Sequence, residues 1–145
     1  MPTAEIAVRE AGPDDAAAVA ELLTQLGAVG VDPAEAERRL ARGAERVLLA
    51  VADGRPAGLV AVMRSLYLGH AEPSAHVTAM VVGDAFRRRG IGRRLMVAAA
   101  EAGRSMGCAG IELTSALTPQ REAAHAFYAA LGYQRTSYRY WLPLS

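Results

Sequence analysis

The 145-residue sequence lacks several features on which whole classes of protein depend. Cys108 is its one cysteine, so an intrachain disulfide and a zinc cluster of cysteines are both excluded. The formal net charge is only +1, which argues against a broad nucleic-acid-binding surface. No apolar run approaches the ~20 residues that cross a bilayer. The start "MPTAEIAVRE" shows no basic segment followed by an apolar one, as a signal peptide would. We therefore expect a cytoplasmic protein without a metal site and without a membrane or nucleic-acid partner.

Apolar residues, in contrast, are abundant. They make up 52% of the chain, and the length is that of one ordinary domain. No internal repeat, low-complexity tract or linker interrupts it. We expect a single domain over residues 1–145 with a substantial core.

The hydrophobic pattern predicts elements in the order β-α-α-β-β-β-α-β-α-β. This order is typical of a mixed sheet covered by helices, in the α/β or α+β class. Asp14 or Asp15 is expected to cap the first helix and Asp32 the second. The predicted strands are 6–10, 46–52, 57–68, 76–82, 110–116 and 133–142, and the predicted helices are 15–26, 32–44, 92–106 and 120–131.

The segment "AFRRRGIGRRLM", residues 85–96, joins a predicted buried strand to a predicted helix. Gly90 and Gly92 lack side chains, so backbone N–H groups can approach a ligand closely there. The first N–H groups of a helix have no intrahelical partner and lie at the positive end of its dipole, which suits phosphate. Five arginines surround the glycines and can add charge-assisted contacts: Arg87, Arg88, Arg89, Arg93 and Arg94.

Two common phosphate-binding patterns do not fit this segment. A dinucleotide fingerprint needs a third glycine where Leu95 stands, and a Walker loop needs a "GK" pair that the chain does not contain. The alternative to an anion-binding site is a tight loop with a solvated basic face and no ligand. The glycines at a strand-to-helix junction beside five arginines favour an anion site.

"RRRGIG", residues 87–92, resembles the Q/R-x-x-G-x-G/A signature of the GNAT family of N-acetyltransferases. The resemblance extends to the preceding "TAMVV", to the following "GRRLMVAAAEAGRSMG" and to "REAAHAFYAALGYQRT" at 121–136. It thus covers nearly the whole chain. It implies a GNAT fold and acetyl-CoA as cosubstrate.

The resemblance also implies where acetyl-CoA binds. The strand before the loop would pair its backbone with the pantetheine arm, and a β-bulge with a splay from the next strand would open the slot. Strand 110–116 would line the other wall. The pantetheine positions are Met80, Val81 and Val82, and the pyrophosphate positions are Arg87, Arg88, Arg89, Gly90, Ile91, Gly92 and Arg93.

Acetyl transfer to an amine requires removal of a proton, an oxyanion donor and an acid for the thiolate. Tyr128 matches the family's usual tyrosine acid, although a core role on its apolar helical stripe is also open. A backbone N–H around Val81 or Val82 would be the oxyanion donor. Many relatives place a glutamate base where Thr78 stands. His76 lies on the same strand face and is our candidate base, with Glu72 on a nearby loop as a further one. The alternatives are a histidine without a catalytic role on a partly exposed strand and a solvated loop carboxylate.

The expected activity is direct acetyl transfer from acetyl-CoA to a small-molecule amine. The sequence resembles, in its overall pattern, family members that acetylate aminoalkylphosphonates or aminoglycosides. A protein N-terminus or lysine side chain is an alternative acceptor. A non-catalytic acyl-CoA-binding or regulatory domain is a second reading, and an RNA-binding module ranks last. The resemblance to the family also implies a homodimer that forms through the C-terminal strand region.

Overall fold

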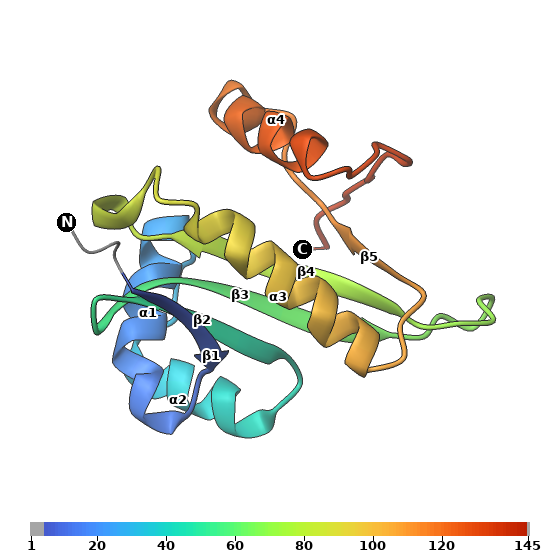
Figure 1. Cartoon of the computed structure of the whole chain (residues 1–145). Coiled ribbons are helices and arrows are strands. Elements are labelled where there is room, and N and C mark those ends of the chain that lie inside the picture. The colour runs from blue at the N-terminus through green and yellow to red at the C-terminus, as the bar shows by residue number, and fades with distance from the viewer. Residues whose placement is uncertain (1–4, 145) are drawn as a thin grey trace. The chain divides into compact units, whose positions relative to one another are not determined.

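The computed structural model describes residues 5–144 and places five strands and four α-helices within them (Figure 1). Three short 3-10 turns add to these elements, at Pro13–Asp15, Asp84–Phe86 and Pro119–Arg121. The elements are β1 Ile6–Glu10, α1 Ala16–Leu26, α2 Pro33–Arg42, β2 Arg46–Ala52, β3 Arg55–Ser65, β4 Ser74–Val82, α3 Ile91–Ser105, β5 Gly110–Leu113 and α4 Glu122–Ala130.

The strands form one sheet in the order β1-β2-β3-β4-β5. The first four strands pair antiparallel with their neighbours along the chain. Beside β4, the Ala109 N–H donates to the Pro73 carbonyl at 2.9 Å, and further along Glu112 contacts His76. Both contacts advance in the same direction along the two strands, so β5 runs parallel to β4. The predicted mixed sheet covered by helices is therefore confirmed.

Local turn chemistry explains several of the boundaries. Asp53 and Gly54 both have positive φ, 53° and 77°, as a two-residue hairpin turn requires. Asp32 caps α2 by accepting from the Glu35 N–H at 2.8 Å, as predicted. The predicted side-chain cap of α1 is wrong, because Asp15 turns back to the Gly12 N–H and pairs with Arg9 instead.

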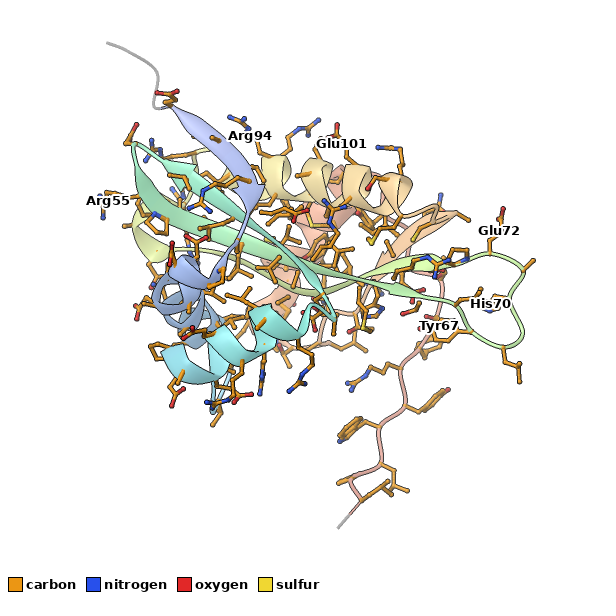
Figure 2. All side chains as sticks on the ribbon, turned by 90° about the horizontal axis from the view of Figure 1, so that it is seen from below. Arg55, Tyr67, His70, Glu72, Arg94 and Glu101 are labelled. Atoms are coloured by element: carbon orange, nitrogen blue, oxygen red, sulfur yellow. The ribbon has the colours of Figure 1, made fainter. Side chains whose placement is uncertain are left out.

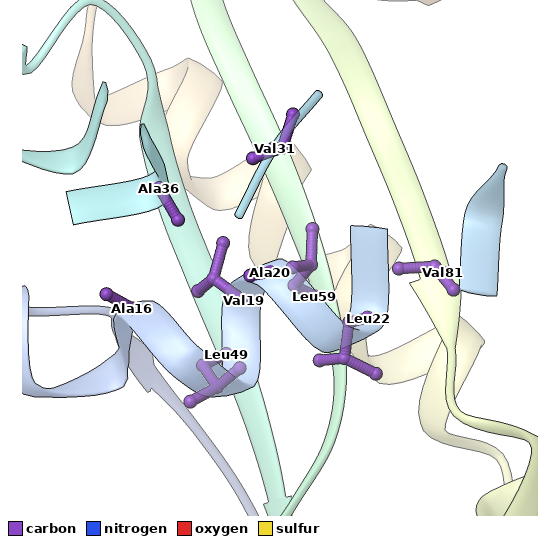
Figure 3. Close-up of a cluster of buried hydrophobic side chains, with 9 residues drawn as sticks. All are labelled: Ala16, Val19, Ala20, Leu22, Val31, Ala36, Leu49, Leu59 and Val81. Carbon is purple, nitrogen blue, oxygen red and sulfur yellow. The ribbon is translucent and has the colours of Figure 1, made fainter. Parts of the chain in front are cut away.

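Two helices cover one face of the sheet (Figure 1). Small and branched side chains from α1, α2 and the loop between them pack there against the central strands (Figure 3). This α1–α2 core contains Ala16, Val19, Ala20, Leu22, Val31, Ala36, Leu49, Leu59 and Val81.

Helix α3 covers the opposite face (Figure 1). Its buried residues Leu95, Ala99 and Ala102 recur at the helical spacing that predicted the helix. Gly103 lies so close to the sheet that a Cβ there would stand 3.0 Å from the Cβ of Ala75. The Ala75 side chain therefore points to the α3 face.

The chain divides into two compact units, one ending at Glu112 and the other beginning at Leu113. The second unit contains α4, which ends before Gly132 at φ 94°. The strand predicted at 133–142 is wrong, since the structure assigns no strand there. An alternating pattern forms a strand only where a neighbour pairs with its backbone, and the pattern alone cannot supply that neighbour. The single domain over 1–145 stays a prediction.

Candidate functional site

A β-bulge in β4 shapes the candidate site. Val62 of β3 pairs with Val77, and the next pair is Ala61 with Ala79. Thr78 is therefore an extra residue on β4 with no counterpart on β3. The bulge that the family resemblance implies in this strand is confirmed, and its position is Thr78.

The bulge reverses the alternation of side chains along β4. Ala75 points to the α3 face, whereas Val81, six residues later, lies in the α1–α2 core (Figure 3). A regular strand would place both on the same face because an even number of residues separates them. His76, next to Ala75, therefore points to the α1–α2 face.

Strand β5 is much shorter than β4 and lies beside its first half. Because Ala109 is level with Pro73 and Glu112 is level with His76, β5 ends near the level of the bulge. The backbone beyond it, at residues 80–82, extends past β5. In an antiparallel pair alternate residues face the partner strand, and because Gly83 bonds to Ala57 of the β3 side, Val81 faces β3 while Met80 and Val82 direct their N–H and C=O groups outward for another partner.

The loop after β4 is anchored to the sheet at its start. The Gly83 N–H donates to the Ala57 carbonyl at 2.7 Å. Phe86 is buried, and the guanidinium groups of Arg55 and Arg89 lie over its ring at 4.9 and 5.8 Å. These contacts hold the loop in place ahead of its glycines.

Two of the loop arginines pair with acidic residues. Arg87 contacts Asp84 at 3.0 Å, and Arg89 contacts Asp53 of the β2–β3 hairpin at 3.1 Å. Arg88, between them, is exposed and has a φ of 64°. Arg87 and Arg89 thus help to fix the loop, and their contact with an anionic ligand stays a prediction.

Gly90 ends the loop in the left-handed region, at φ 76° and ψ 11°, where glycine carries no Cβ penalty. The Arg94 N–H donates to the Gly90 carbonyl at 3.2 Å as α3 begins. Backbone N–H groups at such a helix start lie at the positive end of the dipole. The residues that present them are Ile91, Gly92 and Arg93.

His76 contacts a carboxylate on the neighbouring strand. Its Nδ1 lies 3.2 Å from Oε1 of Glu112, and the two side chains are 24% and 46% exposed. The Tyr67 hydroxyl donates to the same oxygen at 3.4 Å, and the Tyr67 ring meets His70 edge-on at 5.3 Å. Tyr67, His70 and the exposed Glu72 all lie on the loop between β3 and β4 (Figure 2).

Thr78 is bound to a carboxylate from elsewhere in the chain. Its hydroxyl donates to Oε2 of Glu45 at 2.9 Å and lies 3.4 Å from the Ala61 carbonyl. Glu45 directly precedes β2. We refer to this pair, together with His76 and the two side chains that contact it directly or through Glu112, as the polar cluster: Glu45, Tyr67, His76, Thr78 and Glu112.

Three members of the polar cluster, Glu45, Tyr67 and Glu112, were missed by the sequence reasoning. Glu112 alternates with apolar Ile111 and Leu113, which indicates a polar strand face but not which strand lies beside it. Nothing local distinguishes Glu45 from other exposed glutamates.

Tyr128 lies in α4 of the second unit. Its ring contacts those of Phe127 and Tyr133 at centroid distances of 5.2 and 5.9 Å. Burial raises the pKa of the Tyr128 hydroxyl, with the charge of Arg121 lowering it and Tyr133 raising it further. The hydroxyl is therefore protonated at neutral pH and can act as an acid.

His125, one turn before Tyr128, has a local contact in the second unit. Its Nε2 lies 2.9 Å from the Ala116 carbonyl, so this nitrogen carries a proton and ties α4 to the loop before it.

A groove of about 660 Å³ lies on the α3 face, between α3 and strands β1 and β2. Arg93 and Arg94 of α3 line it, together with Arg46 and Leu48 of β2. It includes no residue of the polar cluster, which lies on the other face.

Two features are absent from the described part of the chain. Within residues 5–144 no helix is both long and apolar enough to cross a bilayer. The same residues contain no group of three or more His, Cys, Asp or Glu side chains placed to hold a metal ion.

Comparison with protein families gives one match that spans most of the chain. The model of the acetyltransferase (GNAT) family matches residues 16–133. This span includes the bulged strand, the arginine–glycine loop, the polar cluster and Tyr128.

Solved structures share this fold at low sequence identity. An aminoglycoside N-acetyltransferase in complex with CoA has a TM-score of 0.84 at 18% identity, covering 99% of this chain and 97% of its own. Glucosamine-6-phosphate N-acetyltransferase from Arabidopsis thaliana gives 0.79 at 22%, covering 97% and 99%. A ribosomal-protein-alanine N-acetyltransferase from Brucella melitensis gives 0.83 at 20%, covering 97% and 100%.

Proposed function

Because the chain belongs to the acetyltransferase (GNAT) family, whose cosubstrate is acetyl-CoA, we propose that it acetylates a primary amine of a small molecule by direct transfer. One observation carries the proposal. The backbone of β4 runs past the end of β5 and leads directly into a loop with a left-handed glycine at a helix start. A long, thin ligand with an amide-containing arm and a pyrophosphate fits that sequence of backbone groups.

In this proposal the cofactor is bound mainly by backbone. Met80 and Val82 pair with the pantetheine arm through their outward amide groups, and Val81 lies between them on the same strand. The helix start at Gly90 and Gly92 binds the pyrophosphate. Exposed Arg88 and Arg93 add charge-assisted contacts to it.

The polar cluster supports an amine as the acceptor. Glu45 and Glu112 bring two carboxylates to the α1–α2 face of the sheet, near the bulge. Carboxylates attract the ammonium form in which an amine arrives at neutral pH. The aminoglycoside and glucosamine-6-phosphate enzymes with this fold favour an amino sugar or a related small amine, such as an aminoalkylphosphonate.

The ammonium first loses one proton to water, because only the neutral amine has a lone pair that can attack, and the transfer itself then needs two further proton transfers. The amine nitrogen attacks the thioester carbonyl carbon, the C–N bond forms, and the C–S bond breaks to give an amide and the CoA thiolate. His76 accepts the proton that leaves the amine, and Tyr128 donates a proton to the thiolate. The raised pKa of Tyr128 supports this role, because its hydroxyl is protonated when the thiolate departs.

The direct test is a turnover assay with acetyl-CoA against a panel of small amines, aminoglycosides and peptides. Tyr128→Phe retains the ring, so acetyl-CoA affinity should change little while turnover falls ~10²–10⁴-fold. Near-normal turnover of Tyr128→Phe on the best acceptor would return this tyrosine to a packing role.

A protein acceptor is the second candidate, favoured by the fold match to a ribosomal-protein-alanine N-acetyltransferase. Peptides in the panel decide between the two. If acetyl-CoA binds but no amine is acetylated, a non-catalytic acyl-CoA-binding domain replaces the enzyme. The proposal includes a cytoplasmic location and a homodimer through the C-terminal segment, where Tyr138, Tyr140 and Trp141 are exposed.

A further inference from the structure

Glu112 takes part in neither proton transfer of the proposed reaction, yet its Oε1 lies 3.2 Å from Nδ1 of the proposed base. We propose that Glu112 is the positioning residue for His76: it fixes the imidazole proton on Nδ1 and leaves Nε2 as the atom that accepts the amine's proton. This inference rests on the proposed function, in which His76 is the base.

The chemistry of the contact determines the proton's position. An ionised carboxylate only accepts hydrogen bonds. Oε1 of Glu112 lies 3.2 Å from Nδ1 of His76, so Nδ1 must be the donor. A neutral imidazole has one N–H, so the lone pair then resides on Nε2.

The surroundings hold Glu112 in this position. Its Oε1 also accepts from the Tyr67 hydroxyl at 3.4 Å, and Tyr67 packs edge-on against His70. His76 and Glu112 lie on neighbouring strands, whose backbone spacing sets the distance between the two side chains. On the other side of β4, the residue paired with His76 is apolar Met63. The remaining charge of the cluster, Glu45, is bound to Thr78.

The arrangement also suits the proton transfer itself. When the amine nitrogen forms its bond to the acetyl carbon, its proton moves to Nε2 and the imidazole becomes a cation. The negative charge of Glu112 beside Nδ1 stabilises that cation. The proton then leaves Nε2 for solvent, which restores the neutral ring.

Nitrogen-15 NMR of the histidine rings measures the tautomer without any need for catalysis. The wild-type protein should show His76 with its proton on Nδ1 at a pH where the ring is neutral. In Glu112→Ala it should shift toward the Nε2–H form that imidazole favours in water. Glu37→Ala, an exposed glutamate on α2, is the charge-matched control and should leave His76 unchanged.

A kinetic double-mutant cycle then tests the catalytic purpose. Glu112→Ala should lower kcat ~10- to 100-fold, as loss of a partner that orients a functional histidine does. The KM for acetyl-CoA should not change. In a His76→Ala background the second substitution should add almost nothing, because Glu112 acts through the histidine.

Three results would overturn the inference: a wild-type His76 protonated on Nε2, an equal loss from Glu112→Ala with and without His76, or full turnover by His76→Ala. Failure of the proposed function is distinct, because wild-type protein would then acetylate no amine in the panel. The tautomer of His76 would still be measurable in that case, and its Nε2–H form would refute the positioning by Glu112 independently.

Discussion

The two ends of β4 differ in which chemical groups they expose, backbone groups at one end and side chains at the other. The loop end, residues 80–92, consists of a strand edge, a left-handed glycine and the first amides of α3. The other end is the polar cluster, whose five side chains come from four separate parts of the chain. One end therefore offers a ligand backbone groups, and the other offers side chains.

This difference determines how each end responds to substitution. At a backbone-built site most side chains can change, and only the space and φ freedom that glycine provides are restricted. At a site built from side chains, the loss of one functional group alters the chemistry while the backbone stays in place. The proposed cofactor site should thus be sensitive to added atoms, and the proposed acceptor site to removed ones.

The largest effect is expected from Gly92→Asp. The new carboxylate would stand against the pyrophosphate, and juxtaposed like charges cost several kcal/mol. Acetyl-CoA affinity measured by calorimetry should fall at least ~10²-fold. The fold should tolerate the change, since an acidic residue is favourable in the first turn of a helix.

Val97→Asp is the matched control, because it adds the same charge to an exposed position further along α3. It should leave acetyl-CoA affinity nearly unchanged. Unaltered affinity in folded Gly92→Asp would contradict the assignment of the loop end to the pyrophosphate.

The next effect concerns a methyl group added beside the backbone of β4. A Cβ on Gly58 of β3 would stand 2.8 Å from the Val81 carbonyl oxygen and 3.1 Å from Leu95 Cδ1. Gly58→Ala should lower the free energy of unfolding by ~1–3 kcal/mol, the usual cost of overpacking. It should also weaken acetyl-CoA binding, because the shifted carbonyl belongs to the pantetheine strand.

Chemical denaturation of Gly58→Ala and Gly69→Ala measures this effect. Gly69 has open space where its Cβ would be, so its substitution should be nearly neutral. Equal stability of the two variants would mean that β3 and β4 adjust without cost.

A smaller effect is expected at the polar end from Glu45→Gln. Removing one partly solvated charge should raise the KM for a cationic amine about two- to fivefold at low salt, and less at high salt. The KM for acetyl-CoA should stay the same. An amine KM that is unchanged at low salt would exclude Glu45 from acceptor binding.

The smallest effect should come from Thr78→Val, which removes the hydroxyl that holds Glu45. Because Thr78 acts on the acceptor only through Glu45, we expect at most about a twofold rise in the amine KM. In a Glu45→Gln background the same substitution should have no further effect. A larger loss in that background would show that Thr78 contacts the acceptor directly.

The sequence alone predicted the loop end in some detail. Glycine at a turn and arginine around it are local signals, and the helix that follows has a clear apolar period. The hairpin at Asp53 and Gly54 and the cap at Asp32 were predictable for the same reason, since each depends on a few adjacent residues.

The polar cluster could not be predicted in the same way. Glu45 and Thr78 are 33 positions apart, and His76 and Glu112 are 36 apart. Their contacts depend on strand register, on the order of the sheet and on the bulge, none of which leaves a local pattern. The wrong strand at 133–142 has a similar cause, because pairing is not a property of one segment.

The bulge at Thr78 also divides β4 into two segments in which the alternation of side chains between the two faces is reversed. Before it, odd-numbered residues such as Ala75 pack against α3; after it, odd-numbered Val81 packs against α1 and α2. Deleting a single residue between them would let the strand pair without the bulge, which keeps Ala75 and Val81 on their present faces but removes the irregularity at Thr78. The proposed acceptor chemistry lies at the bulge, between the residues of β4 that pack against α3 and those that pack against α1 and α2. Loss of one residue here should therefore alter the proposed acceptor site while the packing against both helix layers stays intact.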